Sequence, residues 1–176
     1  TLRLFKNRPD ILRQSQQTFK HIFVDEFQDA TASQFELMRI LSSNGGHITV
    51  CGDDDQSIYG WRGAAVQGFQ LFADTYKDHQ SVILNQTFRN SGHIVEAVGS
   101  LIKKNTKRRE KILWTDNEAG ELVDFRISKS KQKEAQSIVH EIKNRMEAFG
   151  FQYRDFAVLS RTRNALKAAT DCFKRH

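Results

Sequence analysis

The stretch His21-Ile-Phe-Val-Asp25-Glu26-Phe-Gln-Asp29 is a short apolar run that ends in two adjacent carboxylates. A run rich in β-branched and aromatic residues, followed by polar residues, predicts a strand. In enzymes that transfer phosphoryl groups, one carboxylate at such a strand end can bind Mg²⁺ while its neighbour polarises the attacking water. Taken alone, the same residues also fit an ordinary acidic loop after a strand.

Four more apolar runs predict strands, and the segments between them have the spacing of amphipathic helices. The helical segments include residues 35–41, 66–76 and 94–102. The clearest, residues 135–149, is followed by Gly150, a residue that often ends a helix. Strands that alternate with helices predict an α/β fold with a parallel sheet, in which ligands bind beyond the carboxyl ends of the strands. The further predicted strands are Ile48–Cys51, Val82–Leu84, Leu122–Ile127 and Phe156–Leu159.

Length and composition exclude several classes of protein. The 176 residues, 39% hydrophobic and 27% charged, can bury a core and are too mixed for a disordered chain. No apolar run approaches the roughly 18–20 residues of a membrane helix, and residues 1–10 lack a signal-peptide pattern, so we expect no membrane. Cys51 and Cys172 are too few for a disulfide scaffold. We therefore expect a reducing, intracellular compartment, either the cytoplasm with its nucleoid or the nucleus.

The net charge of +6 is unevenly distributed. Residues 1–100 carry 9 Lys/Arg against 11 Asp/Glu, whereas residues 101–176 carry 18 against 10. The densest basic stretch could bind a polyanion by releasing counterions, or it could be a solvated helix end and loop. This stretch contains Lys103, Lys104, Lys107, Arg108, Arg109 and Lys111.

A second loop, residues 52–63, follows the next predicted strand and places carboxylates, an amide, two aromatic rings and an arginine between three glycines. Gln56 could donate to a phosphate oxygen and so sense a γ-phosphate. Tyr59 and Trp61 could stack on unpaired bases, each stack being worth about 1–3 kcal/mol, with Arg62 on a backbone phosphate. The alternative is that both rings belong to the core and the glycines mark a tight turn.

A third element, residues 82–91, combines a predicted strand with a helix that Asn90 or Ser91 could cap. Phe88 and Arg89 lie between them. A flat ring beside a planar fork of donors suits a ligand that carries both a nucleobase and a polyphosphate. As a dipeptide alone, however, this pair better fits a buried ring beside a surface arginine.

Together the three elements resemble the UvrD-like branch of superfamily 1 DNA helicases in order, spacing and residue type. Residues 25–29 are similar to that family's Mg²⁺-binding and hydrolysis motif, residues 52–64 to its ATP-to-DNA coupling motif, and residues 84–89 to its next motif. Residues 112–116 and 156–165 also resemble the family, so the likeness covers nearly the whole chain.

The resemblance implies a role for each site residue. Asp25 would bind Mg²⁺, Glu26 would activate the attacking water, and Gln56 would report on the γ-phosphate of ATP. Arg89 would act as an arginine finger across a cleft. Phe88, where the family usually has tyrosine, would stack on the adenine. The path of single-stranded DNA would be lined by Tyr59, Trp61 and Arg62.

The resemblance also implies a fold and an activity. The chain would contain the latter part of one RecA-like domain, the ATP-binding domain, in residues 1–80 and the start of a second in residues 81–176, each with a parallel sheet. The complete protein would use ATP and Mg²⁺ to move 3′ to 5′ along single-stranded DNA and to unwind 3′-tailed duplex DNA. None of the 10 glycines precedes a lysine, so the chain has no G-x-x-x-x-G-K-[ST] phosphate loop. We therefore expect a middle slice that binds DNA weakly and has no ATPase activity of its own.

Two other interpretations are considered. A catalytically inactive helicase-like module would bind nucleic acid or a partner without hydrolysing ATP. In a metal-dependent nuclease, the acidic residues at 25–29 and 53–55 would hold two Mg²⁺ ions about 3.5–4 Å apart. The nuclease interpretation leaves Gln56, Phe88 and Arg89 without a role.

Overall fold

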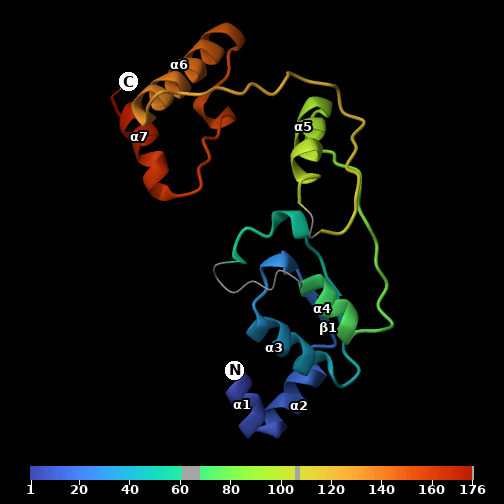
Figure 1. Ribbon diagram of the computed structural model, residues 1–176. Coiled ribbons are helices and arrows are strands. Elements are labelled where there is room, and N and C mark those ends of the chain that lie inside the picture. Colours follow the sequence, from blue (N-terminus) through green and yellow to red (C-terminus); the bar gives the residue numbers. More distant parts are fainter. Residues whose placement is uncertain (61–67, 106–107, 176) are drawn as a thin grey trace. The chain divides into compact units, whose positions relative to one another are not determined.

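The computed structural model describes residues 1–60, 68–105 and 108–175 (Figure 1). Contacts within the chain divide it into two compact units, Thr1–Leu122 and Val123–His176, which are described in turn. The predicted boundary at residue 80 concerns the domains of a protein family. The division by contacts does not test it, and it stays a prediction.

The first unit contains a parallel two-stranded sheet (Figure 1). Strand β1 (His21–Val24) pairs with β2 (His47–Val50), and the register places Val24 opposite Val50. Helix α3 (Ala32–Ser42) lies between the two strands in the sequence, as a parallel connection requires. The predicted α/β class is confirmed as helices combined with a parallel sheet of two strands. Both strands deliver the residues that follow them to the same edge of the sheet.

Phe27 anchors the loop that follows β1 in the core of the first unit. This residue begins the short helix η1 (Phe27–Asp29) and is only 1% exposed. Its ring packs against Phe35, and it meets the rings of Phe69 and Phe72 edge-on, with 5.2 and 5.8 Å between ring centroids. Burial of such a side chain contributes about 1.5–3 kcal/mol. The residues before and after Phe27 are therefore held at a fixed place.

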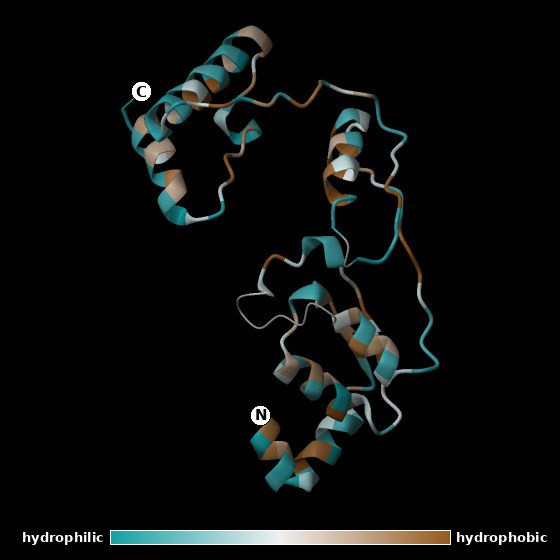
Figure 2. Ribbon diagram, viewed as in Figure 1, coloured by the Kyte–Doolittle hydropathy of each residue, from teal (hydrophilic) through white to brown (hydrophobic). Residues whose placement is uncertain are grey.

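The other helices of the first unit differ in how much apolar surface they bury. The longest, at residues 92–102, has no buried residue, although the ribbon colours of Figure 2 mark hydrophobic residues along it. The helices near the amino terminus bury one residue each. Their bounds are α1 (Leu2–Asn7), α2 (Pro9–Thr18), η2 (Asp54–Gln56), α4 (Gly68–Thr75) and α5 (Gly92–Ile102).

Three predicted strands are not strands in the part of the chain that the structure describes. Residues 82–84, 122–127 and 156–159 have no ladder partner, and a single parallel bridge joins Gln86 to Trp114. A strand needs a neighbour for its N–H and C=O groups, which an apolar sequence does not supply. Many of the side chains in these segments stay in solvent. The most exposed are Val82 at 82%, Phe125 at 85%, Ile127 at 88% and Leu159 at 91%.

The second unit is built on two helices that pack together, α6 (Lys131–Phe149) and α7 (Arg163–Phe173). A short helix, η4 (Tyr153–Asp155), lies between them in the sequence. The helix predicted at residues 135–149 is confirmed, and Gly150 ends it with φ of 72°. The buried contacts between α6 and α7 come from Ala135, Val139, Ala169 and Cys172.

No helix within the described ranges combines the length and the apolar character needed to cross a membrane. Both cysteines are free thiols, with Cys51 exposed and Cys172 buried.

Candidate functional site

Strand β1 ends at two carboxylates, Asp25 and Glu26, that both lie in solvent. Glu26 has φ of 50° and ψ of 43°, and it is the only residue other than glycine with a positive φ in the described part of the chain. Its backbone N–H donates to Oδ1 of Asp25 at 2.9 Å. The left-handed region costs a non-glycine residue on the order of 1 kcal/mol and persists where the surroundings impose it. The conformation therefore supports a functional constraint on this turn.

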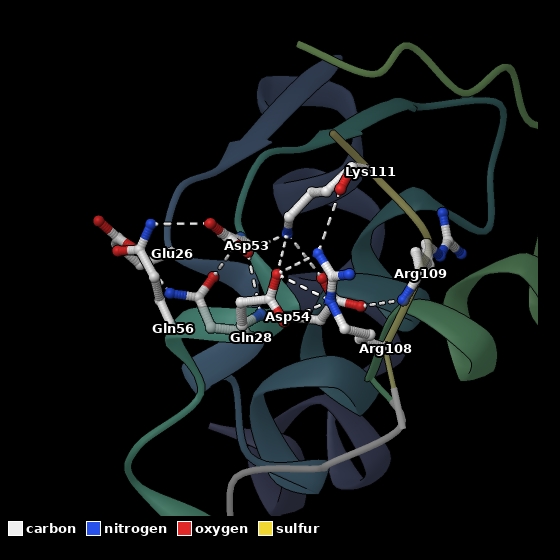
Figure 3. A network of polar contacts seen from close by, with 9 residues as sticks. Glu26, Gln28, Asp53, Asp54, Gln56, Arg108, Arg109 and Lys111 are labelled. Carbon is white, nitrogen blue, oxygen red and sulfur yellow. Dashed lines mark hydrogen bonds and ion pairs between the residues drawn. The ribbon is translucent and has the colours of Figure 1, made fainter. Parts of the chain in front are cut away.

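Gln28 joins the loop after β1 to the loop after β2 (Figure 3). The residue is 4% exposed. Nε2 of Gln28 donates to Oε2 of Glu26 at 2.6 Å, and Oε1 accepts from the backbone N–H of Asp53 at 3.0 Å. A Cβ atom at Gly52 would overlap Oε1 of Gln28 and lie 2.9 Å from the backbone nitrogen of Phe27. Only glycine fits at position 52 without displacing this connection.

Gln56 is held by the same loop, at the end of η2. Nε2 of Gln56 donates to Oδ2 of Asp53 at 3.0 Å. Oδ1 of Asp53 accepts from the backbone N–H of Asp55 at 2.9 Å, which fixes the carboxylate itself. A continuous path of hydrogen bonds thus runs from Glu26 through Gln28 and Asp53 to Gln56 (Figure 3).

The acidic loop, defined here as residues 53–55, is bound by one lysine from a distant part of the sequence. Nζ of Lys111 contacts Oδ1 of Asp53, lies 3.0 Å from Oδ1 of Asp54 and lies 3.1 Å from Oδ2 of Asp55. The side chain of Lys111 is 12% exposed. The three carboxylates come within 4.8 Å of one another, a spacing that could suit a metal ion. The ammonium group of Lys111 already lies among these carboxylates and offsets part of their charge, which argues against a nuclease metal site here.

Two arginines complete the contacts with the acidic loop (Figure 3). Arg108 donates to Asp55 from two nitrogens, Nε to Oδ1 and Nη2 to Oδ2, each at 2.9 Å. The backbone N–H of Arg109 donates to Oδ2 of Asp54 at 2.6 Å. The Arg109 guanidinium lies over the ring of Phe69, and its Nη2 donates to the backbone carbonyl oxygen of Phe69 at 3.2 Å. Residues 108–111, called the basic segment below, therefore follow the shape of the acidic loop.

The ion pairs keep this network charged. Burial alone would raise the pKa of Asp53, but hydrogen bonds from Lys111 and Gln56 outweigh it and lower the pKa. The same balance, with Arg108 and Lys111 as donors, lowers the pKa of Asp55. Burial works against the charged form of Lys111 too, and the three carboxylates nonetheless raise its pKa. All these groups are ionised across the neutral range.

Phe88 and Arg89 lie on a separate loop and both point into solvent. Phe88 is 77% exposed, so the expectation of a buried ring is wrong. Nδ2 of Asn117 donates to the carbonyl oxygens of Phe88 at 3.1 Å and Asn90 at 3.0 Å, on either side of Arg89. Among the hydrogen bonds and ion pairs of the described residues, none joins Arg89 to Glu26.

The structure brings together some of the predicted site residues and not others. Glu26 and Gln56 belong to one hydrogen-bonded path, Asp25 adjoins it, and Phe88 and Arg89 are on another loop. Tyr59 is 36% exposed and does not belong to the core. Trp61 and Arg62 lie outside the described residues.

Sequence reasoning missed Gln28, Asn117 and the partner of the basic stretch. Lys103 and Lys104 are exposed, which fits both a polyanion site and a solvated helix end. For Arg108 and Lys111, neither a polyanion site nor a solvated loop is correct, because both side chains are mostly buried against the acidic loop. The only available signal was the opposite charge of the two segments. Charge alone does not select which acidic residues a basic stretch will meet.

Comparison with known proteins gives matches along the whole chain. Residues 1–77 match the family described as UvrD/REP helicase N-terminal domain, and residues 82–176 match the UvrD-like helicase C-terminal domain. The protein named ATP-dependent DNA helicase PcrA from Staphylococcus aureus is 35% identical over 175 residues, which cover 99% of this chain and 24% of that relative. PcrA from Staphylococcus epidermidis is 34% identical over the same shares. The chain spans about a quarter of the length of these relatives, and it belongs to the family of UvrD-like helicases.

Proposed function

We propose that this chain is part of an ATP-dependent DNA helicase that couples ATP hydrolysis to 3′ to 5′ movement along single-stranded DNA and to duplex unwinding. The hydrogen-bonded path from Glu26 to Gln56 carries the proposal, because it joins the residue expected to activate water to the residue expected to sense ATP. Family membership supports it, as do relatives whose printed name is ATP-dependent DNA helicase. The proposed arrangement is RecA-like, with one domain ending and another beginning near residue 80.

Asp25 is the proposed ligand of Mg²⁺. It is an exposed carboxylate at the carboxyl end of a parallel strand, and carboxylate oxygen is a ligand type that Mg²⁺ prefers. Its Oδ1 accepts from the adjacent backbone N–H, which holds the carboxylate in place. When bound, Mg²⁺ would neutralise charge on the phosphates of ATP.

Glu26 is the proposed residue that orients and activates the attacking water. The amide of Gln28 fixes one of its carboxylate oxygens and leaves the exposed group facing solvent. Gln56 donates one amide N–H to Asp53. An amide has a second N–H and a carbonyl oxygen, so Gln56 can still donate to a γ-phosphate oxygen and accept from a water.

Phe88 and Arg89 are the proposed adenine-stacking residue and arginine finger. Their exposure leaves the ring face and the guanidinium available to a nucleotide, and Asn117 holds the backbone on both sides of Arg89. Tyr59 and Trp61 would stack on bases of single-stranded DNA, and Arg62 would bind a backbone phosphate. Both named relatives are bacterial, so they support a cytoplasmic or nucleoid location and give no support to a nuclear one.

The test is DNA-stimulated ATP hydrolysis by the full-length protein that carries this sequence. We expect hydrolysis that Glu26→Gln lowers by at least about a hundredfold, since general-base catalysis contributes roughly 10²–10⁴. The matched substitution Glu147→Gln, on the exposed side of α6, should leave the rate unchanged. A full-length protein that binds single-stranded DNA without hydrolysing ATP would support the alternative, an inactive helicase-like binding module.

A further inference from the structure

The contact between the acidic loop and the basic segment joins two parts of the chain that match different helicase domains. Residues 53–55 fall in the part that matches the N-terminal helicase domain, and residues 108–111 fall in the part that matches the C-terminal one. Lys111 lies 58 residues from Asp53 along the chain, yet its ammonium contacts all three carboxylates. The arrangement is therefore a specific long-range contact.

The contact reaches Gln56 through one carboxylate group. Oδ1 of Asp53 binds Lys111, and Oδ2 of the same carboxylate accepts from Nε2 of Gln56 at 3.0 Å. A carboxylate bound at one oxygen by a buried ammonium cannot rotate without breaking that ion pair. The direction in which Asp53 presents its other oxygen, and hence the position of the Gln56 amide, depends on Lys111 together with the Asp55 backbone N–H, which donates to the same Oδ1 (Figure 3).

The charges give Lys111 a further effect on the acidic loop. Three carboxylates within 4.8 Å repel one another, and Asp55 is 7% exposed, so little water screens it. Removing the cation would leave the partly buried carboxylates of Asp53 and Asp54 without an ion pair among the described residues, which destabilises a site more than loss of an exposed pair would. Arg108 hydrogen-bonds to the carboxylate of Asp55 and would act on the other two carboxylates only from a greater distance. The acidic loop is expected to open without Lys111, and Gln56 would move with it.

We propose that Lys111 is a positioning residue for Gln56. A residue in the part of the chain that matches the C-terminal helicase domain thereby holds in position the γ-phosphate sensor, which lies in the part that matches the N-terminal domain. This inference rests on the proposed function, because it takes Gln56 to be that sensor. Arg108 supports the same loop by its paired contacts with Asp55.

The test compares Lys111→Met with Lys111→Arg in the full-length protein that carries this sequence. Loss of the cation should lower the kcat of DNA-stimulated ATP hydrolysis about tenfold or more, while the KM for ATP and the Kd for single-stranded DNA stay within about twofold. Lys111→Arg keeps the charge and should retain more of the kcat than Lys111→Met does. Lys129→Met, at an exposed lysine before α6 to which no DNA contact is assigned, is the control and should match the wild type.

A double-substitution cycle separates positioning from general support of the fold. If Lys111 acts through Gln56, then Lys111→Met should cost nothing further in a Gln56→Ala background. An equal further loss there, a normal kcat for Lys111→Met, or an equal loss for Lys129→Met would overturn the inference. If Lys111→Met does not fold, Asp53→Asn replaces it in the cycle. Asp53→Asn should then lower the kcat on its own and cause no further loss in the Gln56→Ala background. A wild-type protein that hydrolyses no ATP would instead refute the proposed function, and this inference with it.

Discussion

The side-chain amide of Asn117 donates to the carbonyl oxygen of Phe88 at 3.1 Å. The same nitrogen donates to Asn90 at 3.0 Å, so one amide fixes the backbone before and after Arg89. Two backbone hydrogen bonds from Gly92 and His93 to the segment after Asn117 continue this contact. An exposed loop thereby acquires a defined shape without burying its side chains.

Replacing Asn117 by aspartate keeps the shape and removes both N–H donors. Two carbonyl oxygens would then face a carboxylate, so we expect the loop to loosen and lose about 1 kcal/mol of local stability. Hydrogen exchange should quicken at residues 87–93 and stay unchanged in α6. Asn105→Asp, at an exposed position, is the matched control. Unchanged exchange at residues 87–93 in Asn117→Asp would show that this contact does not order the loop.

Replacing Gly52 by alanine should break the connection made by Gln28. The added methyl group would meet the Gln28 side chain and the backbone of Phe27, neither of which can move freely in the core. We expect a loss of about 1–3 kcal/mol in the free energy of unfolding, measured with urea. Gly99→Ala is the control, because nothing lies within 4 Å of a Cβ in the middle of α5, and alanine there should stabilise slightly. Equal effects at both positions would contradict the assigned role of Gly52.

Asp55 should make the stability of the chain depend on pH in acid. The folded state lowers the pKa of Asp55 below its usual value of 3.8, so the stabilisation is present above that pH and is lost as the pH falls through the lower folded-state value. Asp55→Asn should therefore be less stable than the wild type at pH 7, with the difference narrowing below about pH 4. Urea unfolding at a series of pH values measures this. Asp78→Asn, at an exposed position, is the control and should show no such trend. If the difference in unfolding free energy between the wild type and Asp55→Asn stayed constant with pH, the ion pairs of Asp55 would be excluded as the cause of that difference.

Tyr59 should contribute to the binding of single-stranded DNA by stacking. Tyr59→Ala is expected to raise the Kd of this chain for an unstructured oligonucleotide by about tenfold, and Trp61→Ala should do the same. Tyr153→Ala, which removes a ring that is 58% exposed in the second unit, serves as the control. A salt series with Lys103→Ala/Lys104→Ala separates stacking from charge, because loss of phosphate contacts reduces the salt dependence. Affinity that follows only the lysines would leave the rings without a role.

How far the sequence predicts this structure depends on the range of the interactions involved. Local patterns were sufficient for the helix at residues 135–149, for Gly150 at its end, and for the two strands that place Asp25 and Asp53 at one edge. The strand expected at residues 82–84 requires a partner, and its own sequence does not supply one.

The polar connections of the site could not be predicted because they depend on what lies opposite each side chain. Gln28 and Asn117 are ordinary amides until the fold brings Asp53 and Phe88 to them. Lys111 was part of a basic stretch that predicted a polyanion site or a solvated loop. Only the fold shows that the anion it binds is the acidic loop of the same chain.

Strand separation by the full-length protein that carries this sequence tests the central claim most directly. Wild type and Glu26→Gln would be compared on two duplexes that differ only in whether the single-stranded tail is 3′ or 5′. We predict that the wild type unwinds the 3′-tailed duplex when ATP and Mg²⁺ are supplied, and that Glu26→Gln binds this duplex without unwinding it. Failure of the wild type to unwind the 3′-tailed duplex, or equal unwinding by Glu26→Gln, would contradict the account.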